Sequence, residues 1–166
     1  MKKQKAVFST TYSEYQIEDL IFTKGEQMVK LEAEEILHIQ VECSEPLPVK
    51  DGLDGYLRVI PITGGTVSGK ITGEVISGGA DWNTEKAGQC SHAFAKYLLR
   101  TDDGEYIAIE NEGIIAHGSD SFIKTSPRFT ADKNSKYAWL NQGVYAGSLQ
   151  PGEGKISVVI RIYRLL

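Results

Sequence analysis

The chain has 166 residues, 41% of them hydrophobic, which is enough for one domain with a buried core. Its formal charge of −4 argues against a surface that binds nucleic acid. The basic start, MKKQK, is not followed by an apolar segment of signal-peptide length, and no stretch approaches a membrane span. The two cysteines, Cys43 and Cys90, do not make a disulfide framework, so we predict a reduced, cytoplasmic protein without membrane contact.

Apolar residues alternate with polar ones along most of the chain, beginning with the stretch from Val29 to Val41. Overlapping this stretch, Glu26 to Ile36 is rich in good helix formers, so a short helix is the alternative there. Further strands are predicted at Tyr56–Ile62, Ile71–Ile76, Phe94–Arg100, Tyr106–Glu112, Trp139–Ala146 and Ile156–Tyr163. Short strands with glycine-rich turns and no repeated strand–helix spacing predict an antiparallel all-β domain, a barrel or a sandwich.

One hairpin can be given a register from the sequence. A three-residue turn at Asp102–Gly104 leaves the glycine for the left-handed position, whereas a two-residue turn would shift every pair by one residue. The three-residue turn is preferred because it gives an ion pair outside and an apolar row inside. Its facing pairs are Ala95–Asn111, Lys96–Glu110, Tyr97–Ile109 and Leu99–Ile107. Asn111 is thereby predicted to face inward.

Three other segments are interpreted as turns or loops. ECSEPLPVKDGLDG and SPRFTADKNSK are predicted surface loops. Gly64–Ile71 approaches a phosphate-binding loop, but isoleucine stands where Ser or Thr should follow Lys70, and the next residues alternate like a strand. We therefore predict a β-turn and no nucleotide cofactor.

No metal site is expected either. Cys90 and His92, even with His38 and Cys43, lack the spacing of zinc ligands, and a small buried thiol with an exposed imidazole explains them. No Gly-x-Ser-x-Gly elbow supports a hydrolase triad.

Polar and aromatic residues in three places suggest a site. Gly78-Gly79 delivers Asp81 and Trp82 at a strand end, which suits proton transfer or hydroxyl recognition; a turn aspartate and a packing tryptophan are the alternative. Arg128, fixed by the preceding proline, is placed to hold an anion or simply to lie on the surface. In the predicted strand YAWLNQGVYAG, Asn141 shares a face with Trp139.

Several motifs, taken in order, resemble the domain of unknown function 3237 (DUF3237) family, also called uncharacterised protein family 0311 (UPF0311). They are GKITGEVISGGADW, AKYLLRTDDGEYIAIENEGI, FIKTSPRF and KYAWLNQGVYAGS, with IPITGGTVSG upstream and ISVVIRIYRLL at the end. The resemblance covers residues 31–166, leaves residues 1–30 as an extension packing on or extending the sheet, and implies a single closed up-and-down β-barrel. The family has no established general activity. Its motif positions fall on Asp81, Trp82, Arg100, Asn111, Gly113, His117, Arg128, Trp139 and Asn141, with Gln142 and Gly143 departing from the usual basic and bulky residues.

The leading hypothesis is a barrel that binds a small organic molecule inside, without a cofactor. Trp82, Trp139 and Tyr97 supply walls, Asn111 and Asn141 supply hydrogen bonds, and Arg128 or Arg100 supplies charge. One alternative is a cofactor-free isomerase, hydratase or lyase with Asp81 or His117 as acid or base. Another is a structural or subunit-interaction domain with a filled core. A homodimer is expected from outward Leu98, Val144 and Val159.

Overall fold

The computed structural model describes residues 21–24, 27–118, 123–153 and 156–166, with side chains from residue 31 onward. The chain divides into two compact units, Met1–Glu32 and Ala33–Leu166. In the first, β1 (Ile21–Lys24) pairs antiparallel with β2 (Gln27–Lys30). The helical alternative for Glu26–Ile36 is therefore wrong over its described residues, since pairing between strands prevails over local helix propensity. The packing of residues 1–30 on the sheet stays a prediction, and residues 1–20 lie outside the described part.

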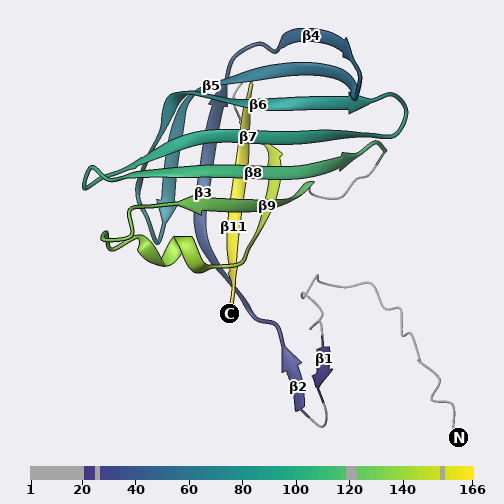
Figure 1. Ribbon diagram of the computed structural model, residues 1–166. Helices are drawn as coiled ribbons and strands as arrows, with labels where there is room; N and C mark the ends of the chain where they lie inside the picture. The colour runs from purple at the N-terminus through teal and green to yellow at the C-terminus, as the bar shows by residue number, and fades with distance from the viewer. Residues whose placement is uncertain (1–20, 25–26, 119–122, 154–155) are drawn as a thin grey trace, which may run out of the picture. The chain divides into compact units, whose positions relative to one another are not determined.

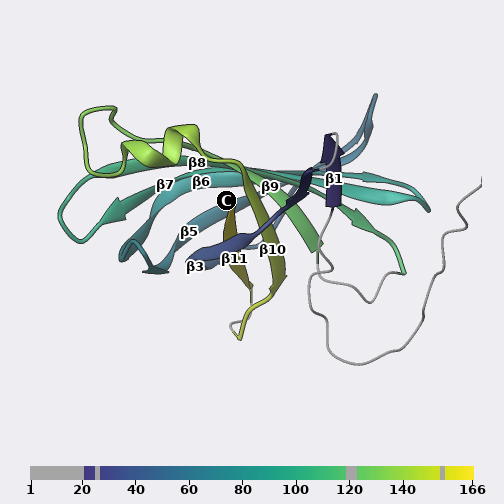
Figure 2. The same cartoon turned by 90° about the horizontal axis from the view of Figure 1, so that it is seen from below.

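The second unit is a closed antiparallel β-barrel, as predicted (Figure 1). Its strands are β3 (Ala33–Cys43), β4 (Leu47–Gly52), β5 (Gly55–Gly69), β6 (Gly73–Lys86), β7 (Cys90–Thr101), β8 (Tyr106–Ala116), β9 (Ile123–Thr130), β10 (Tyr145–Pro151) and β11 (Ser157–Leu165). From β5 to β11 each strand pairs with the next, and β3 pairs with both β11 and the second half of β5, which closes the ring. The remaining strand, β4, pairs with the first half of β5. Figure 2 shows β3, β10 and β11 facing β6, β7 and β8 across the interior.

The predicted hairpin is confirmed in its register. Lys96 lies opposite Glu110 and Ala95 opposite Asn111. The Lys96 Nζ and Glu110 Oε1 atoms are 2.7 Å apart on the outer face. Gly104 has φ +93°, the conformation that the three-residue turn requires. Because side chains alternate, this one register places the inward residues of both strands.

Three predicted loops are wrong because they contain strand residues. The segment Gly64–Gly69 is not a turn but the part of β5 that pairs with β3, and a side chain at Gly65 or Gly69 would meet the β3 backbone. The glycines here permit close strand contact rather than reversal of the chain. Likewise, β4 occupies one predicted loop, and β9 takes up the first five residues of SPRFTADKNSK, although Pro127 discouraged a strand.

Trp139–Ala146 is not one strand, which is a further correction. Residues Ala138–Gln142 form a 3₁₀ helix, η1, and β10 begins only at Tyr145. The alternation of this segment is misleading because Tyr137 and Leu140, three residues apart, both enter the core from a helical turn. We call the β7–β8 turn together with residues 131–144, which include η1, the closed end of the barrel.

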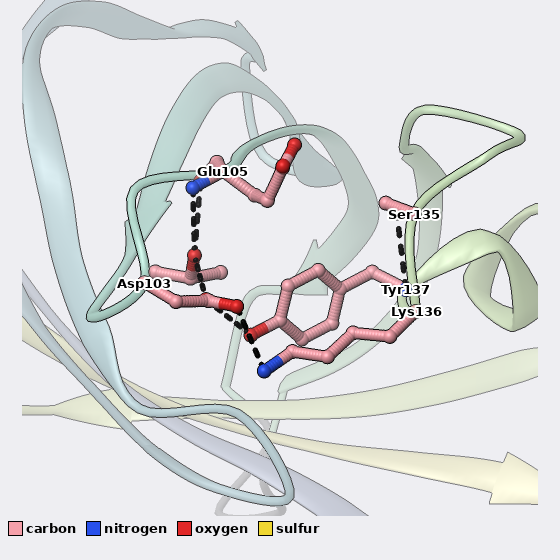
Figure 3. Close-up of polar contacts among 6 residues, drawn as sticks. Asp103, Glu105, Ser135, Lys136 and Tyr137 are labelled. Atoms are coloured by element: carbon pink, nitrogen blue, oxygen red, sulfur yellow. Dashed lines mark hydrogen bonds and ion pairs between the residues drawn. The ribbon is translucent and has the colours of Figure 1, made fainter.

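Side-chain hydrogen bonds hold the closed end together (Figure 3). The Tyr137 hydroxyl donates to Asp103 Oδ1 at 2.6 Å, and the Thr101 hydroxyl donates to the same oxygen at 2.7 Å. Lys136 Nζ lies 2.7 Å from Asp103 Oδ2. These bonds lower the pKa of the Asp103 carboxyl well below its usual range, the contact with Lys136 contributing most. The polar groups of this end therefore satisfy one another.

Candidate functional site

One inward row of residues crosses four strands and brings together two predicted site residues. Asp81 on β6 lies opposite Ala95, Ala95 lies opposite Asn111, and Asn111 lies opposite Pro127. Asp81 and Asn111 are therefore two strand spacings apart, about 9.6 Å by ordinary sheet geometry. The single methyl of Ala95 between them leaves both polar side chains facing the same part of the interior.

The adjacent inward row consists mostly of very small residues. Ala93 lies opposite Gly113, Gly113 opposite Thr125, and Thr125 opposite Gly147. A side chain at Gly147 would collide with the Thr125 hydroxyl, so the strand needs glycine there. We call these two rows, together with Tyr97, the polar half of the interior. Four of its members, Ala93, Ala95, Gly113 and Gly147, carry at most one side-chain carbon.

Three buried polar atoms of the polar half have no hydrogen-bond partner within the described chain: Tyr97 Oη, Asn111 Oδ1 and Thr125 Oγ1. Their residues are 3%, 4% and 7% exposed. They lie on the adjacent strands β7, β8 and β9. Tyr97 on β7 and Thr125 on β9 are each diagonal neighbours of Asn111 on β8. Burial raises the pKa of the Tyr97 hydroxyl, which therefore stays protonated. Buried polar groups are normally paired, so three unpaired atoms on adjacent strands indicate a site.

Asp81 is partly buried, is held in place by the backbone, and interacts with Asn83, Arg58 and His92. The Phe94 N–H donates to Asp81 Oδ1 at 2.8 Å. Burial raises the pKa of the Asp81 carboxyl, and the bond from Phe94 opposes that rise in part. Burial, followed by the nearby Asp81 carboxyl, also raises the pKa of the Cys43 thiol. A carboxyl fixed through one oxygen and biased toward its protonated form has the properties of a general acid or base.

An arginine lies at the outer limit of this polar half. Arg58 Nε donates to Asn83 Oδ1 at 3.1 Å, and Arg58 Nη1 lies 3.7 Å from Glu85 Oε2. Asn83 is two residues beyond Asp81 on β6 and is 3% exposed. Arg58 and Asp81 are each partly exposed, so this end of the interior reaches solvent.

Three predicted site residues lie on the outer face instead. Trp82 is 51% exposed, so it is not a wall of the interior. Arg128 is exposed and lies opposite Glu110, because Pro127 takes the inward position. Arg100 forms an ion pair with Glu74 along a surface hollow of about 520 Å³. Because side chains alternate along a strand, each of these three residues is next in sequence to one that faces the interior. The register of strand pairing decides which of the two neighbours faces the interior.

Asn141 also faces away from the interior, and its role is structural. The Ala131 N–H donates to Asn141 Oδ1 at 2.8 Å, and Asn141 Nδ2 donates to the Ala131 carbonyl at 2.9 Å. This two-point contact ties η1 to the end of β9. Trp139 is partly buried against the core at the closed end, with Arg164 over its ring at 5.5 Å. The expected meeting of Asn141 with Asn111 is therefore wrong.

His117 lies at the end of β8 and is exposed. Its Nε2 atom is 3.2 Å from the Oγ atom of buried Ser91. Within the described residues, no three histidine, cysteine, aspartate or glutamate side chains are grouped as metal ligands. No helix of the described part is long and apolar enough to cross a membrane.

Sequence reasoning missed Thr125, Asn83, Arg58 and Cys43. The alternating residues Ile123, Thr125, Pro127 and Phe129 predict the inward position of Thr125 once Pro127 is accepted in a strand. Asn83 has the same parity as Asp81 and so shares its face. No local signal identifies Arg58 or Cys43, whose positions depend on pairing with distant strands.

Comparison with known proteins gives a family and a fold. Residues 31–165 match the family described as "Protein of unknown function (DUF3237)". A UPF0311 protein of Rhodopseudomonas palustris is 32% identical over 128 residues, which cover 68% of this chain and 82% of the relative. A β-barrel-like protein of Acinetobacter baumannii has a TM-score of 0.76 at 28% identity, covering 86% of this chain and all of that structure.

A more distant solved structure is described as an enzyme from Penicillium herquei. It has a TM-score of 0.67 and 23% identity, and the match covers 86% of this chain and all of that one. At this identity the likeness shows the barrel fold.

Proposed function

This chain belongs to the DUF3237 family, and from that premise we propose that the polar half of its barrel binds a small organic molecule. The observation that carries the proposal is the set of three unpaired atoms, Tyr97 Oη, Asn111 Oδ1 and Thr125 Oγ1. Each buried polar group left without a partner costs about 1–3 kcal/mol. A bound molecule with matching polar groups offsets that cost.

The contrast with the closed end supports this interpretation. There the Tyr137 hydroxyl, in a residue 8% exposed, is paired with Asp103. The same fold therefore satisfies a buried tyrosine hydroxyl where only stability is needed, and leaves Tyr97 unsatisfied beside Asn111.

Side-chain volume is also consistent with a bound molecule. Ala93, Ala95, Gly113 and Gly147 contribute little volume to the rows that carry the unpaired atoms. An eight-stranded barrel has an interior of the size that one small ligand or packed side chains fill. Phe129 on β9 and Tyr145 on β10 pack edge to face, with ring centroids 5.0 Å apart, and form an apolar boundary next to these rows.

Acid–base catalysis by Asp81 is the second candidate, and the environment of its carboxyl favours it. Burial raises the pKa of the Asp81 carboxyl, which is the direction that acid–base catalysis requires of a carboxyl. The Phe94 N–H and the Asn83 side chain both hydrogen-bond this carboxyl, which fixes its position for proton transfer. His117, the other acid–base candidate, is exposed and lies next to Ser91, so it receives less support.

Binding can be tested by amide NMR with a library of neutral fragments. We expect some fragments to shift the amides of residues 95–97, 111–113 and 125–126. Ala95→Leu should abolish those shifts because it fills the space between Asp81 and Asn111. Ala108→Leu, on the outer face of the same hairpin, is the matched control and should leave them unchanged. Failure of every fragment to shift the three segments would contradict the proposal.

Asp81→Asn separates binding from catalysis once a ligand is found. An enzyme that uses the Asp81 carboxyl loses turnover, because an amide neither donates a proton as an acid nor accepts one as a base. A binding protein changes only in affinity.

A further inference from the structure

We infer that the ligand is a neutral molecule that presents a hydroxyl or N–H group to Asn111 Oδ1. The inference rests on the proposed function, and it specifies the chemistry of the bound molecule. Asn111 Oδ1 is buried and has no hydrogen-bond partner among the described residues. A carboxamide oxygen accepts hydrogen bonds and cannot donate them.

The surroundings of Asn111 leave that acceptor to the ligand. Its direct cross-strand neighbours, Ala95 and Pro127, have no polar side-chain atoms. Along β8, the nearest residues on the same face are Ile109 and Gly113, which are also apolar. Among the described residues nothing donates to this oxygen, so we assign its donor to the ligand. A ligand bearing only acceptors would leave it unpaired at further cost.

The two neighbouring hydroxyls can adapt to such a donor. Tyr97 and Thr125 flank Asn111 diagonally, one on each adjacent strand, and their hydroxyl oxygens are unpaired. Each hydroxyl can donate or accept. A ligand hydroxyl that donates to Asn111 Oδ1 keeps its own lone pairs for Tyr97 or Thr125, so a single group can satisfy two protein atoms.

Charge decides between a neutral and an ionic ligand. The buried polar side chains of the described residues are all uncharged: Asn83, Ser91, Thr101, Asn111 and Thr125. Arg58, at the outer limit, is engaged with Asn83 and Glu85. A carboxylate would thus face the Asn111 oxygen without a cation, and a buried unpaired charge is strongly unfavourable.

In the polar half, Asp81 is the only described residue whose charge could neutralise an ammonium ligand. Burial shifts that carboxyl toward its neutral form, and the Phe94 N–H already occupies one oxygen. A neutral donor meets the needs of Asn111, Tyr97 and Thr125 without an uncompensated charge.

The experiment uses four probes of similar shape: cyclohexanol, methoxycyclohexane, cyclohexanecarboxylate and cyclohexylammonium. Dissociation constants are measured by amide NMR, from residues 95–97 and 111–113 of the full chain. We expect cyclohexanol to bind at least about tenfold more tightly than its methyl ether, the effect of one buried hydrogen bond. Both charged probes should bind more weakly than the alcohol.

Two variants test whether Asn111 is the cause. Asn111→Leu should remove the preference for the alcohol, because a leucine has no acceptor. Asn111→Ser is the smaller change and serves if leucine impairs folding. It should strengthen ether binding relative to alcohol binding, because a serine hydroxyl can donate a hydrogen bond. Asn134→Leu, on an exposed loop, is the control and should preserve the original order.

The outcomes distinguish the two proposals. Equal binding of alcohol and ether in the interior, or tighter binding of a charged probe, would overturn this inference while leaving interior binding intact. If none of the four probes shifts those amides, both this inference and the proposed function are contradicted.

Discussion

Two tyrosines show how differently the two regions of the barrel treat polar groups. At the closed end, Tyr137 is 8% exposed and its hydroxyl donates to Asp103. In the polar half, Tyr97 is 3% exposed and its hydroxyl has no partner among the described residues. The asparagines differ in the same way, since Asn141 makes two bonds to Ala131 while Asn111 Oδ1 makes none within the described part of the chain.

This difference indicates a division of work within one small fold. The closed end uses polar groups to join η1 and a turn, each bond replacing one made to water in the unfolded chain. The polar half holds the same kinds of groups in buried, unpaired positions, which a fold selected only for stability would avoid. The comparison predicts that substitutions in the closed end weaken the fold, whereas comparable ones in the polar half chiefly affect binding.

The largest effect is expected from Leu140→Ala. Leu140 is 1% exposed and packs into the core from η1. Its truncation should lower the free energy of unfolding by about 2–5 kcal/mol, through lost burial and the cavity left behind. Urea denaturation measures this loss. Leu98→Ala, on the outer face and 41% exposed, should cost less than about 1 kcal/mol. Similar losses for both would show that η1 is not part of the core.

A smaller loss is expected from Asn141→Leu. The change removes both bonds to Ala131 and should cost about 1–3 kcal/mol. Asn134→Leu, whose side chain is exposed, provides the baseline in the same urea assay. Weaker binding of an interior ligand in Asn141→Leu, at unchanged stability, would place Asn141 in the site and contradict its structural role.

Asp103→Asn should change how stability depends on pH. The folded state lowers the pKa of Asp103, so its contribution is present above the unfolded pKa of about 4 and is lost as pH falls toward the folded value. The wild type should therefore exceed Asp103→Asn in stability at pH 6, with the gap closing below about pH 4. Urea midpoints measured between about pH 2.5 and about pH 7 test this difference. A gap that is constant with pH would exclude the ion pair as its cause.

The smallest effect on stability is expected from Asn111→Leu. Replacing a buried oxygen that has no partner removes an unfavourable group, so the free energy of unfolding should change by less than about 1 kcal/mol. This variant should lose less stability than Asn141→Leu, although Asn111 is much the more buried residue. The reverse order would mean that Asn111 holds the barrel together, and would remove the contrast between the two regions.

The hairpin around Asn111 shows what the sequence determines by itself. The turn residues and the charges of Lys96 and Glu110 are local, and together they determine the register. That register in turn determines that Tyr97 and Asn111 face inward. The all-β class and the family motifs are equally visible, because alternation and glycine spacing are properties of short stretches.

Only the tertiary structure decided the rest, because it depends on contacts between distant segments. Asn141 is turned outward by η1 and by its bonds to Ala131, which no alternation pattern contains. Closure of the ring between β3 and β5 places Cys43, and pairing of β5 with β6 places Arg58. Whether a buried polar atom has a partner depends on what the neighbouring strands place opposite it. Ala95 opposite Asn111 follows from the hairpin register, but Pro127 on its other side depends on pairing with β9. Together they leave the Asn111 oxygen without a partner among the described residues.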